Sequence, residues 1–237
     1  MYDIVFISYN EPRFQSNYME LVTRFPFHRV VLVTGVKGIH QAHIAAASKV
    51  NTPMFYVVDA DAKLLPDFKF NIKLDPSEED IVHVWRSRNP VNGLEYGHGG
   101  VKLLPTTLTL NMDISNPDMT TSISKRFKVM DQVSNITSFN VDPLCTWRTA
   151  FRECAKLSSG ILPNQNGDEA IQRLNVWQHN TSSAQFAEYA RGGASAGAWF
   201  GSTYKDDPTM LAKINDYDWL ESEFYGHTSM YPPETFK

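Results

Sequence analysis

The sequence is poor in cysteine, has no long apolar run and carries no excess of positive charge. Its 237 residues include two cysteines, Cys145 and Cys154, and their spacing on an expected helix favours reduced thiols over a disulfide. No apolar stretch approaches the roughly 20 residues that span a bilayer, and the first residues do not resemble a signal peptide. A net charge of -4 at pH 7 provides no general attraction to nucleic acid or anionic lipid. We therefore expect a cytoplasmic protein without a membrane span.

The first part of the chain alternates between short apolar runs and segments with helical spacing. Residues 3–8, 29–34 and 54–58 form almost wholly apolar runs, which are typical of strands covered on both faces. Apolar side chains recur at helical spacing in the intervening segments, 14–25 and 39–50. This order predicts an α/β fold with a Rossmann-like, mostly parallel central sheet flanked by helices. Ligands of such sheets bind at the carboxyl ends of the strands.

An acidic motif, Asp59-Ala60-Asp61, directly follows the third of these runs. Two carboxylates that flank one small residue can hold a hard divalent cation against a diphosphate. The same pattern recurs in Asp216-Tyr217-Asp218, which follows no apolar run and is interpreted as a helix cap. A capped turn is the alternative for the first motif too. Its position predicts that Asp59 and Asp61 bind Mn²⁺ or Mg²⁺.

A second acidic pair, Asp168-Glu169, begins another segment with helical spacing. The helix dipole favours acidic residues in a first turn, so an ordinary helix start is one interpretation. The other is a general base that faces an acceptor hydroxyl, with Arg173 one turn further along. A metal held by one or two carboxylates often gains an imidazole ligand. His179 is the preferred candidate for that ligand, and His227 is the alternative.

The middle of the sequence is less regular. Arg86 and Arg88 lie just past an apolar run and lead into a glycine-rich stretch, residues 92–100, which we expect to be a loop. The two arginines suit phosphate recognition or, equally, a solvated edge. We expect loops with short strands in residues 105–139. The small residues of 191–201 fit tight helix packing better than close approach to a ligand.

Four segments, taken in order, resemble the GT-A glycosyltransferases, especially family-2-like enzymes, and a glycosyltransferase-like group carried by tailed bacteriophages. The segments, which lie within residues 2–180, are Ile4–Glu11, Gly38–Ala47, Phe55–Phe68 and the Gly167-Asp168-Glu169 motif with Arg173. Two positions depart from the family pattern. His43-Ile44 stands where an Arg-Asn pair is usual, and Asp168-Glu169 stands where Glu-Asp is usual. We expect His43 in the core, on the apolar face of its helix.

The resemblance implies a single GT-A-like domain, 1–237, with a nucleotide-binding half, 1–104, and an irregular acceptor-binding half, 105–237. It implies sugar transfer from a nucleotide diphosphate donor, with a UDP-sugar as the first choice, to a hydroxyl group. Asp168 or Glu169 would be the base, and the stereochemical outcome stays open. The residues predicted to contact the donor follow the expected strands: Ser8, Asn10, Glu11, Gly35, Asp59, Arg86 and Arg88.

The sequence leaves the acceptor open. A hydroxymethylated base in phage DNA follows from the phage resemblance, which would place the protein in the host cytoplasm. Binding DNA would need a basic cleft, and its candidates are Lys63, Arg86, Arg88, Lys102, Lys125, Arg126 and Lys128. Protein, glycan and lipid-linked acceptors are also compatible. A nucleotidyltransferase is a rival function, although the first turn, Tyr9–Pro12, lacks the glycines usual there. A non-catalytic binding or virion protein with the same fold is another.

Overall fold

The computed structural model describes residues 1–9, 11–161, 167–232 and 235. The chain divides into two compact units. The first unit comprises Met1–Arg88, Glu95–Ile114 and Met119–Ser138, and the second comprises Asn89–Leu94, Ser115–Asp118 and Phe139–Lys237. The expectation of a single domain divided near residue 104 stays a prediction. Among the described helices, none has both the length and the apolar character needed to cross a bilayer.

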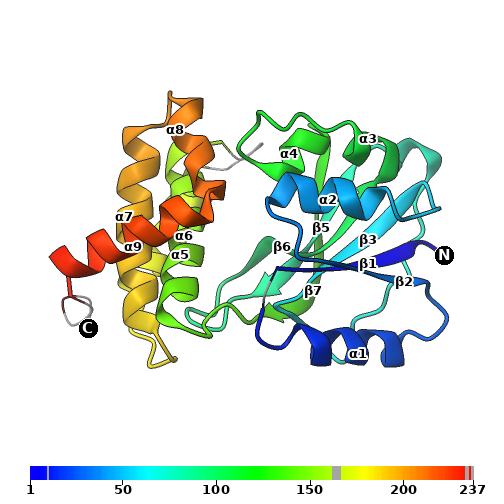
Figure 1. Ribbon diagram of the computed structural model, residues 1–237, viewed down its shortest axis with the longest axis horizontal. Coiled ribbons are helices and arrows are strands. Elements are labelled where there is room, and N and C mark those ends of the chain that lie inside the picture. The colour runs from blue at the N-terminus through cyan, green and yellow to red at the C-terminus, as the bar shows by residue number, and fades with distance from the viewer. Residues whose placement is uncertain (10, 162–166, 233–234, 236–237) are drawn as a thin grey trace. The chain divides into compact units, whose positions relative to one another are not determined.

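The first unit is built on a seven-stranded sheet with the order β2-β1-β3-β6-β5-β7-β4 (Figure 1). The strands are β1 (Asp3–Ser8), β2 (Val30–Thr34), β3 (Met54–Asp59), β4 (Ala62–Leu64), β5 (Val82–Arg88), β6 (Glu95–Pro105) and β7 (Phe127–Thr137). β1 pairs in parallel with β2 and β3, and β5 pairs in parallel with β7. β6 lies antiparallel between β3 and β5, and β4 is antiparallel to β7. All strands except β4 and β6 therefore run in one direction, which confirms a mostly parallel sheet.

Helices cover both faces of this sheet (Figure 1). Besides the short η1 (Pro76–Glu78), the helices of the first unit are α1 (Phe14–Arg24), α2 (Ile39–Ala47), α3 (Thr106–Leu110) and α4 (Met119–Ile123). Successive side chains of a strand point to opposite faces. Phe6 accordingly belongs to a buried cluster with Leu21 of α1, whereas the adjacent Val5 belongs to another with Ala46 of α2. Burial of both faces explains why β1 and β3 are apolar. It confirms the α/β class and is compatible with a Rossmann-like arrangement.

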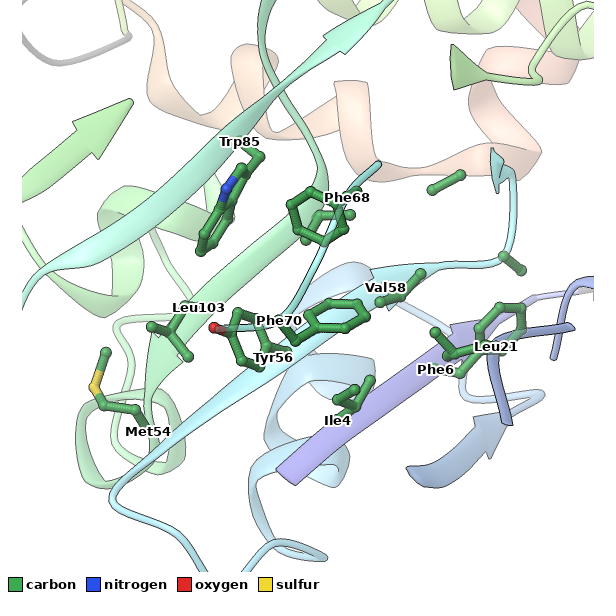
Figure 2. Packing of buried hydrophobic residues seen from close by; sticks show 13 residues of the cluster. Ile4, Phe6, Leu21, Met54, Tyr56, Val58, Phe68, Phe70, Trp85 and Leu103 are labelled. Carbon is green, nitrogen blue, oxygen red and sulfur yellow. The ribbon is translucent and has the colours of Figure 1, made fainter. Parts of the chain in front are cut away.

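An aromatic group fills the α1 side of the sheet (Figure 2). The ring centroid of Phe70 lies 4.7 Å from that of Tyr56 on β3 and 5.0 Å from that of Phe68. Phe68 in turn lies 5.8 Å from Trp85 on β5, and all three pairs are edge-to-face, a favourable arrangement for aromatic rings. The group holds the segment that follows β4 against the sheet, so the chain leaves the Asp59–Asp61 turn on a fixed path.

Two segments differ from expectation. Residues 95–100 form the first part of β6 and are not a loop, because they pair with the last residues of β5. A Cβ at Gly100 would lie 2.7 Å from the Asn135 side chain, so a side chain of β7 fills the space that a side chain at this position would take. Residues 105–139 contain α3, α4 and the 11-residue β7 instead of loops with short strands. Much of the first half of β7 is exposed, and its polar side chains hide the strand in the sequence.

The second unit is helical and not irregular. Its helices are α5 (Pro143–Ser159), α6 (Gly167–His179), α7 (Ala187–Thr203), α8 (Pro208–Ala212), η2 (Lys213–Asn215) and α9 (Tyr217–Met230). The last three lie in the tail, where the sequence shows no clear period. The Asp142 carboxylate caps α5 by accepting from the Cys145 backbone N–H at 2.7 Å. Cys145 and Cys154 are not joined in a disulfide, as expected.

Glycines bring α7 against the backbone of α5. Cβ atoms built at Gly193, Gly197 and Gly201 would lie 2.1–2.2 Å from backbone carbonyl oxygens of α5. Any side chain at these positions would therefore push the two helices apart. The small residues of 191–201 thus permit tight helix packing, as the sequence predicted.

Candidate functional site

The Asp59-Ala60-Asp61 motif lies at the carboxyl end of β3, and its backbone is anchored from several elements. The Ala60 N–H donates to the Ile7 carbonyl of β1 at 2.9 Å, and the Asn17 side chain of α1 donates to the Ala60 carbonyl at 2.8 Å. The Ser138 N–H, just after β7, donates to the Asp61 carbonyl at 2.7 Å. These bonds hold the turn rigidly, which is what a preorganised binding site needs.

The adjacent end of β1 carries a further carboxylate. Glu11 Oε2 accepts from the Ser8 hydroxyl at 2.7 Å and from the Tyr9 backbone N–H at 2.6 Å. The Gly35 N–H, just after β2, donates to the Ser8 carbonyl at 3.1 Å. The structure therefore brings Ser8, Glu11 and Gly35 together at one edge of the sheet, whereas the predicted Asn10 lies outside the described residues.

The carboxyl group of Asp61 is electrostatically unusual. Burial, followed by the charges of Asp59 and Glu11, raises the pKa of Asp61 to about 7, against the opposing effect of Lys102. A carboxyl with such a pKa exists in both protonation states near neutral pH. Perturbed groups of this kind are enriched at functional sites. The Asp61 carboxyl is therefore an electrostatic sign of function at this strand end.

Asp59 is paired with a buried lysine that lies far from this motif in the sequence. Lys102 lies on β6 opposite Val57 of β3, and its ammonium donates to Asp59 Oδ1 at 2.9 Å and to Oδ2 at 2.8 Å. It also donates to the Gly99 carbonyl. The Lys102 side chain is 3% exposed and that of Asp59 is 35% exposed. The sequence contains one sign of this pair, a single lysine within the apolar run 101–104. A lysine buried in such a run requires an acidic or polar partner for its ammonium group.

A divalent ion held by Asp59 does not fit this arrangement. Both carboxylate oxygens of Asp59 already accept from the Lys102 ammonium. Within the described ranges, no three His, Cys, Asp or Glu side chains are grouped in a way that could hold a metal ion. The predicted ligand His179 ends α6 in the second unit, and its Nδ1 lies 3.1 Å from the Asn175 carbonyl oxygen. The requirement for Mn²⁺ or Mg²⁺ thus stays a prediction, and it would rest on Asp61 and not on Asp59.

The predicted arginines lie at the carboxyl end of β5, which runs in the same direction as β3. Arg88 Nε is 2.7 Å from Glu95 Oε1, a close ion pair. Arg86 NH2 is 3.6 Å from Asp131 Oδ1, and the Asp131 side chain is 99% exposed. An ion pair as exposed as this one contributes little. Arg86 is therefore the more available of the two cations.

Three of the basic residues predicted to line a cleft for DNA, Lys102, Arg126 and Lys128, are paired with acidic side chains. Lys102 is buried against Asp59 and cannot contact DNA. Arg126 pairs with Asp80, and Lys128 Nζ lies 2.9 Å from Glu78 Oε1. These pairs offset the positive charge that a phosphate backbone would require.

The predicted base residues lie in the first turn of α6, in the second unit. Asp168 and Glu169 are both exposed. Arg173, the expected companion of this acidic pair, instead forms a close ion pair with Glu153 of α5, and the two side chains are 15% and 13% exposed. Arg173 NH1 lies 3.9 Å from Glu169 Oε1. Arg173 therefore joins two helices, and its role as a partner of the base stays a prediction.

Two further histidines differ in burial: His43 is buried, and His227, the alternative metal ligand, is partly buried. His43 is buried, as expected, and its Nδ1 lies 2.8 Å from the Ile39 carbonyl oxygen. Burial, followed by the charge of Lys102, lowers the pKa of His43 to about 3, so its ring is neutral. His227 packs its ring 5.7 Å from that of Trp147 in the second unit, and burial lowers its pKa. The role of His227 as a metal ligand stays a prediction.

Comparison with known proteins does not assign the chain to a family. No protein-family model matches the sequence, and no curated protein matches it. Among solved structures, the chain is similar to HddC from Yersinia pseudotuberculosis, with a TM-score of 0.33, 11% identity, and 56% of this chain and 92% of that chain covered. It is also similar to S. aureus TarS 1-349, with a TM-score of 0.37, 9% identity, and coverage of 95% and 91%. Similarities of this size leave the function to be inferred from the site itself.

Proposed function

We propose that this chain transfers a sugar from a nucleotide diphosphate donor to a hydroxyl group, with the donor bound at the carboxyl edge of β1, β2 and β3. The observation that carries the proposal is the gathering of Asp59, Asp61 and Glu11 at the adjacent carboxyl ends of β1 and β3. Rossmann-like sheets bind their ligands at this edge. The perturbed carboxyl of Asp61 adds the electrostatic signature of a functional site.

The donor phosphates need positive charge, and Arg86 is the first candidate to supply it. Its side chain is 43% exposed and only loosely paired with Asp131. A planar guanidinium can bind two phosphate oxygens at once. Arg88, which is held by Glu95, is the second candidate. UDP-sugars remain the first choice of donor.

Transfer to a hydroxyl group also requires a base that removes its proton. Asp168 is the first choice and Glu169 the second, because both carboxylates are exposed at the first turn of α6. If the product has inverted stereochemistry, one such base suffices. The acceptor itself, including modified DNA, stays open.

A thermal-shift screen tests this proposal. The protein is heated with nucleoside diphosphates, with their sugar conjugates and without ligand, and a bound ligand raises the unfolding temperature. We expect one nucleotide to stabilise the wild type and to lose this effect in Asp61→Ala. The matched control is Asp218→Ala, which changes an exposed aspartate of the other Asp-x-Asp motif and should respond like the wild type.

The alternative functions predict different results. Stabilisation by no nucleotide at all would contradict the proposal and favour a non-catalytic protein. Release of pyrophosphate from a nucleoside triphosphate and a sugar phosphate would identify a nucleotidyltransferase. An equal response of Asp61→Ala and the wild type would move the donor site away from the end of β3.

A further inference from the structure

Lys102 is a buried cation, and sugar transfer by itself does not explain why a cation is buried at this position. It lies on β6 among apolar neighbours, and its side chain is 3% exposed. Its hydrogen bonds go to both carboxylate oxygens of Asp59 and to the Gly99 carbonyl. An ammonium group has three N–H donors, so these three acceptors account for its full capacity. Lys102 is therefore placed to hold Asp59 and not to bind a ligand.

The position of the ammonium conflicts with a metal ion at Asp59. A divalent cation that shared this carboxylate would stand next to a fixed positive charge, and the two would repel each other. A cation that displaced the ammonium would leave a buried charge without its partner. Both routes weaken metal binding at Asp59, whichever oxygen is approached.

We propose that Lys102 is the resident counter-ion of the strand-end site, which fixes the Asp59 carboxylate and keeps divalent cations from it. Lys102 is then a positioning residue that acts through Asp59. If the proposed function is right, the donor contacts Asp59 as a hydrogen-bond acceptor, and its binding needs no metal held by this residue. The part of the inference that concerns cations stands independently of any donor.

Manganese titration followed by electron paramagnetic resonance tests this directly, because free and bound Mn²⁺ give different signals. We expect Lys102→Met to bind Mn²⁺ about tenfold or more tightly than the wild type, since it frees the Asp59 carboxylate. The double variant Asp59→Asn/Lys102→Met should return to the wild-type affinity. Lys128→Met, which removes an exposed lysine paired with Glu78, is the matched control and should leave the affinity unchanged.

The opposite pattern would overturn the inference. If Asp59 is a metal ligand, the double variant binds Mn²⁺ about tenfold or more weakly than the wild type. An unchanged affinity in a folded Lys102→Met would equally contradict a counter-ion role. The double variant removes both charges of the pair, so its comparison with the wild type decides the matter even if Lys102→Met fails to fold.

A nucleotide-binding experiment distinguishes a failure of this inference from a failure of the proposed function. Nucleoside diphosphates are titrated into the wild type by calorimetry, once with EDTA and once with Mn²⁺. Binding of similar strength in both conditions supports the inference, and binding that requires Mn²⁺ and is lost in Asp59→Asn contradicts it. Absence of binding in both conditions contradicts the proposed function, and the manganese titration then decides the role of Lys102.

Discussion

The Lys102 ammonium donates to both carboxylate oxygens of Asp59, at 2.9 and 2.8 Å, across two neighbouring antiparallel strands. The two side chains are not equally buried, because Lys102 is 3% exposed and Asp59 is 35% exposed. Removal of the carboxylate leaves a cation that water does not reach. Removal of the cation leaves a carboxylate that water still reaches. The two halves of the pair should therefore differ in their effect on stability.

Asp59→Asn is expected to lower the free energy of unfolding by about 3 kcal/mol and Lys102→Met by about 1 kcal/mol. The double variant should lie close to Lys102→Met, because neither charge is then left alone. Urea unfolding followed by circular dichroism measures all three. Equal losses for the two single variants would show that water reaches both partners alike.

The buried neutral ring of His43 predicts a loss of stability in acid. Its pKa is about 3 in the folded protein and 6.5 as the ordinary value, so the unfolded chain binds the proton more readily between these limits. The contribution of His43 to stability is complete above pH 6.5 and is lost as the pH falls toward 3.

Urea unfolding of the wild type and of His43→Leu, measured between pH 7 and pH 4, isolates the contribution of His43. The other histidines titrate in both proteins, so their effect cancels in the comparison. The stability of the wild type should fall relative to the variant by about 1.4 kcal/mol for each pH unit below the ordinary pKa. Parallel pH profiles would contradict a neutral buried ring.

The Asn17 side chain links α1 to the acidic motif, and its removal should loosen the turn. The side chain donates to the Ala60 carbonyl at 2.8 Å, so Asn17→Ala should free the turn and cost about 1 kcal/mol of stability. Hydrogen exchange should become faster in the peptide that contains Ala60. Asn111→Ala removes an exposed bond of the same type within the first unit and should leave this peptide unchanged. Equal exchange in both variants would mean that Asn17 does not hold the turn.

The contact between α5 and α7 predicts a strong effect of one methyl group. A Cβ at Gly197 would lie 2.1 Å from the Phe151 carbonyl oxygen, so Gly197→Ala should destabilise the protein by about 3 kcal/mol. Gly226→Ala is the matched control, because a Cβ on this α9 glycine meets nothing within 4 Å. It should raise stability by about 0.5 kcal/mol, since alanine favours helices. Thermal unfolding compares the two, and similar values would argue against the tight packing of α7.

Local sequence patterns predicted the elements that place the acidic motif. The apolar runs that became β1, β2 and β3, and the helical spacing of α1 and α2, follow from burial on both faces of one sheet. The position of Asp59 at the end of β3 followed from the same run. Local patterns were less useful for β7, because its exposed half alternates weakly, and for residues 95–100, because strand pairing fixes them more than their own side chains do.

The chemical state of the motif depended on the tertiary structure. The sequence by itself placed Asp59 and Asp61 at a strand end, because a strand can be recognised from the spacing of its own residues. It did not place Lys102 beside Asp59, which follows from the pairing of β6 with β3 across 43 residues of sequence. Nor did it show that Arg173 joins Glu153 between α5 and α6. Such pairs depend on which elements pack together, and burial then decides the charge that each carboxylate carries.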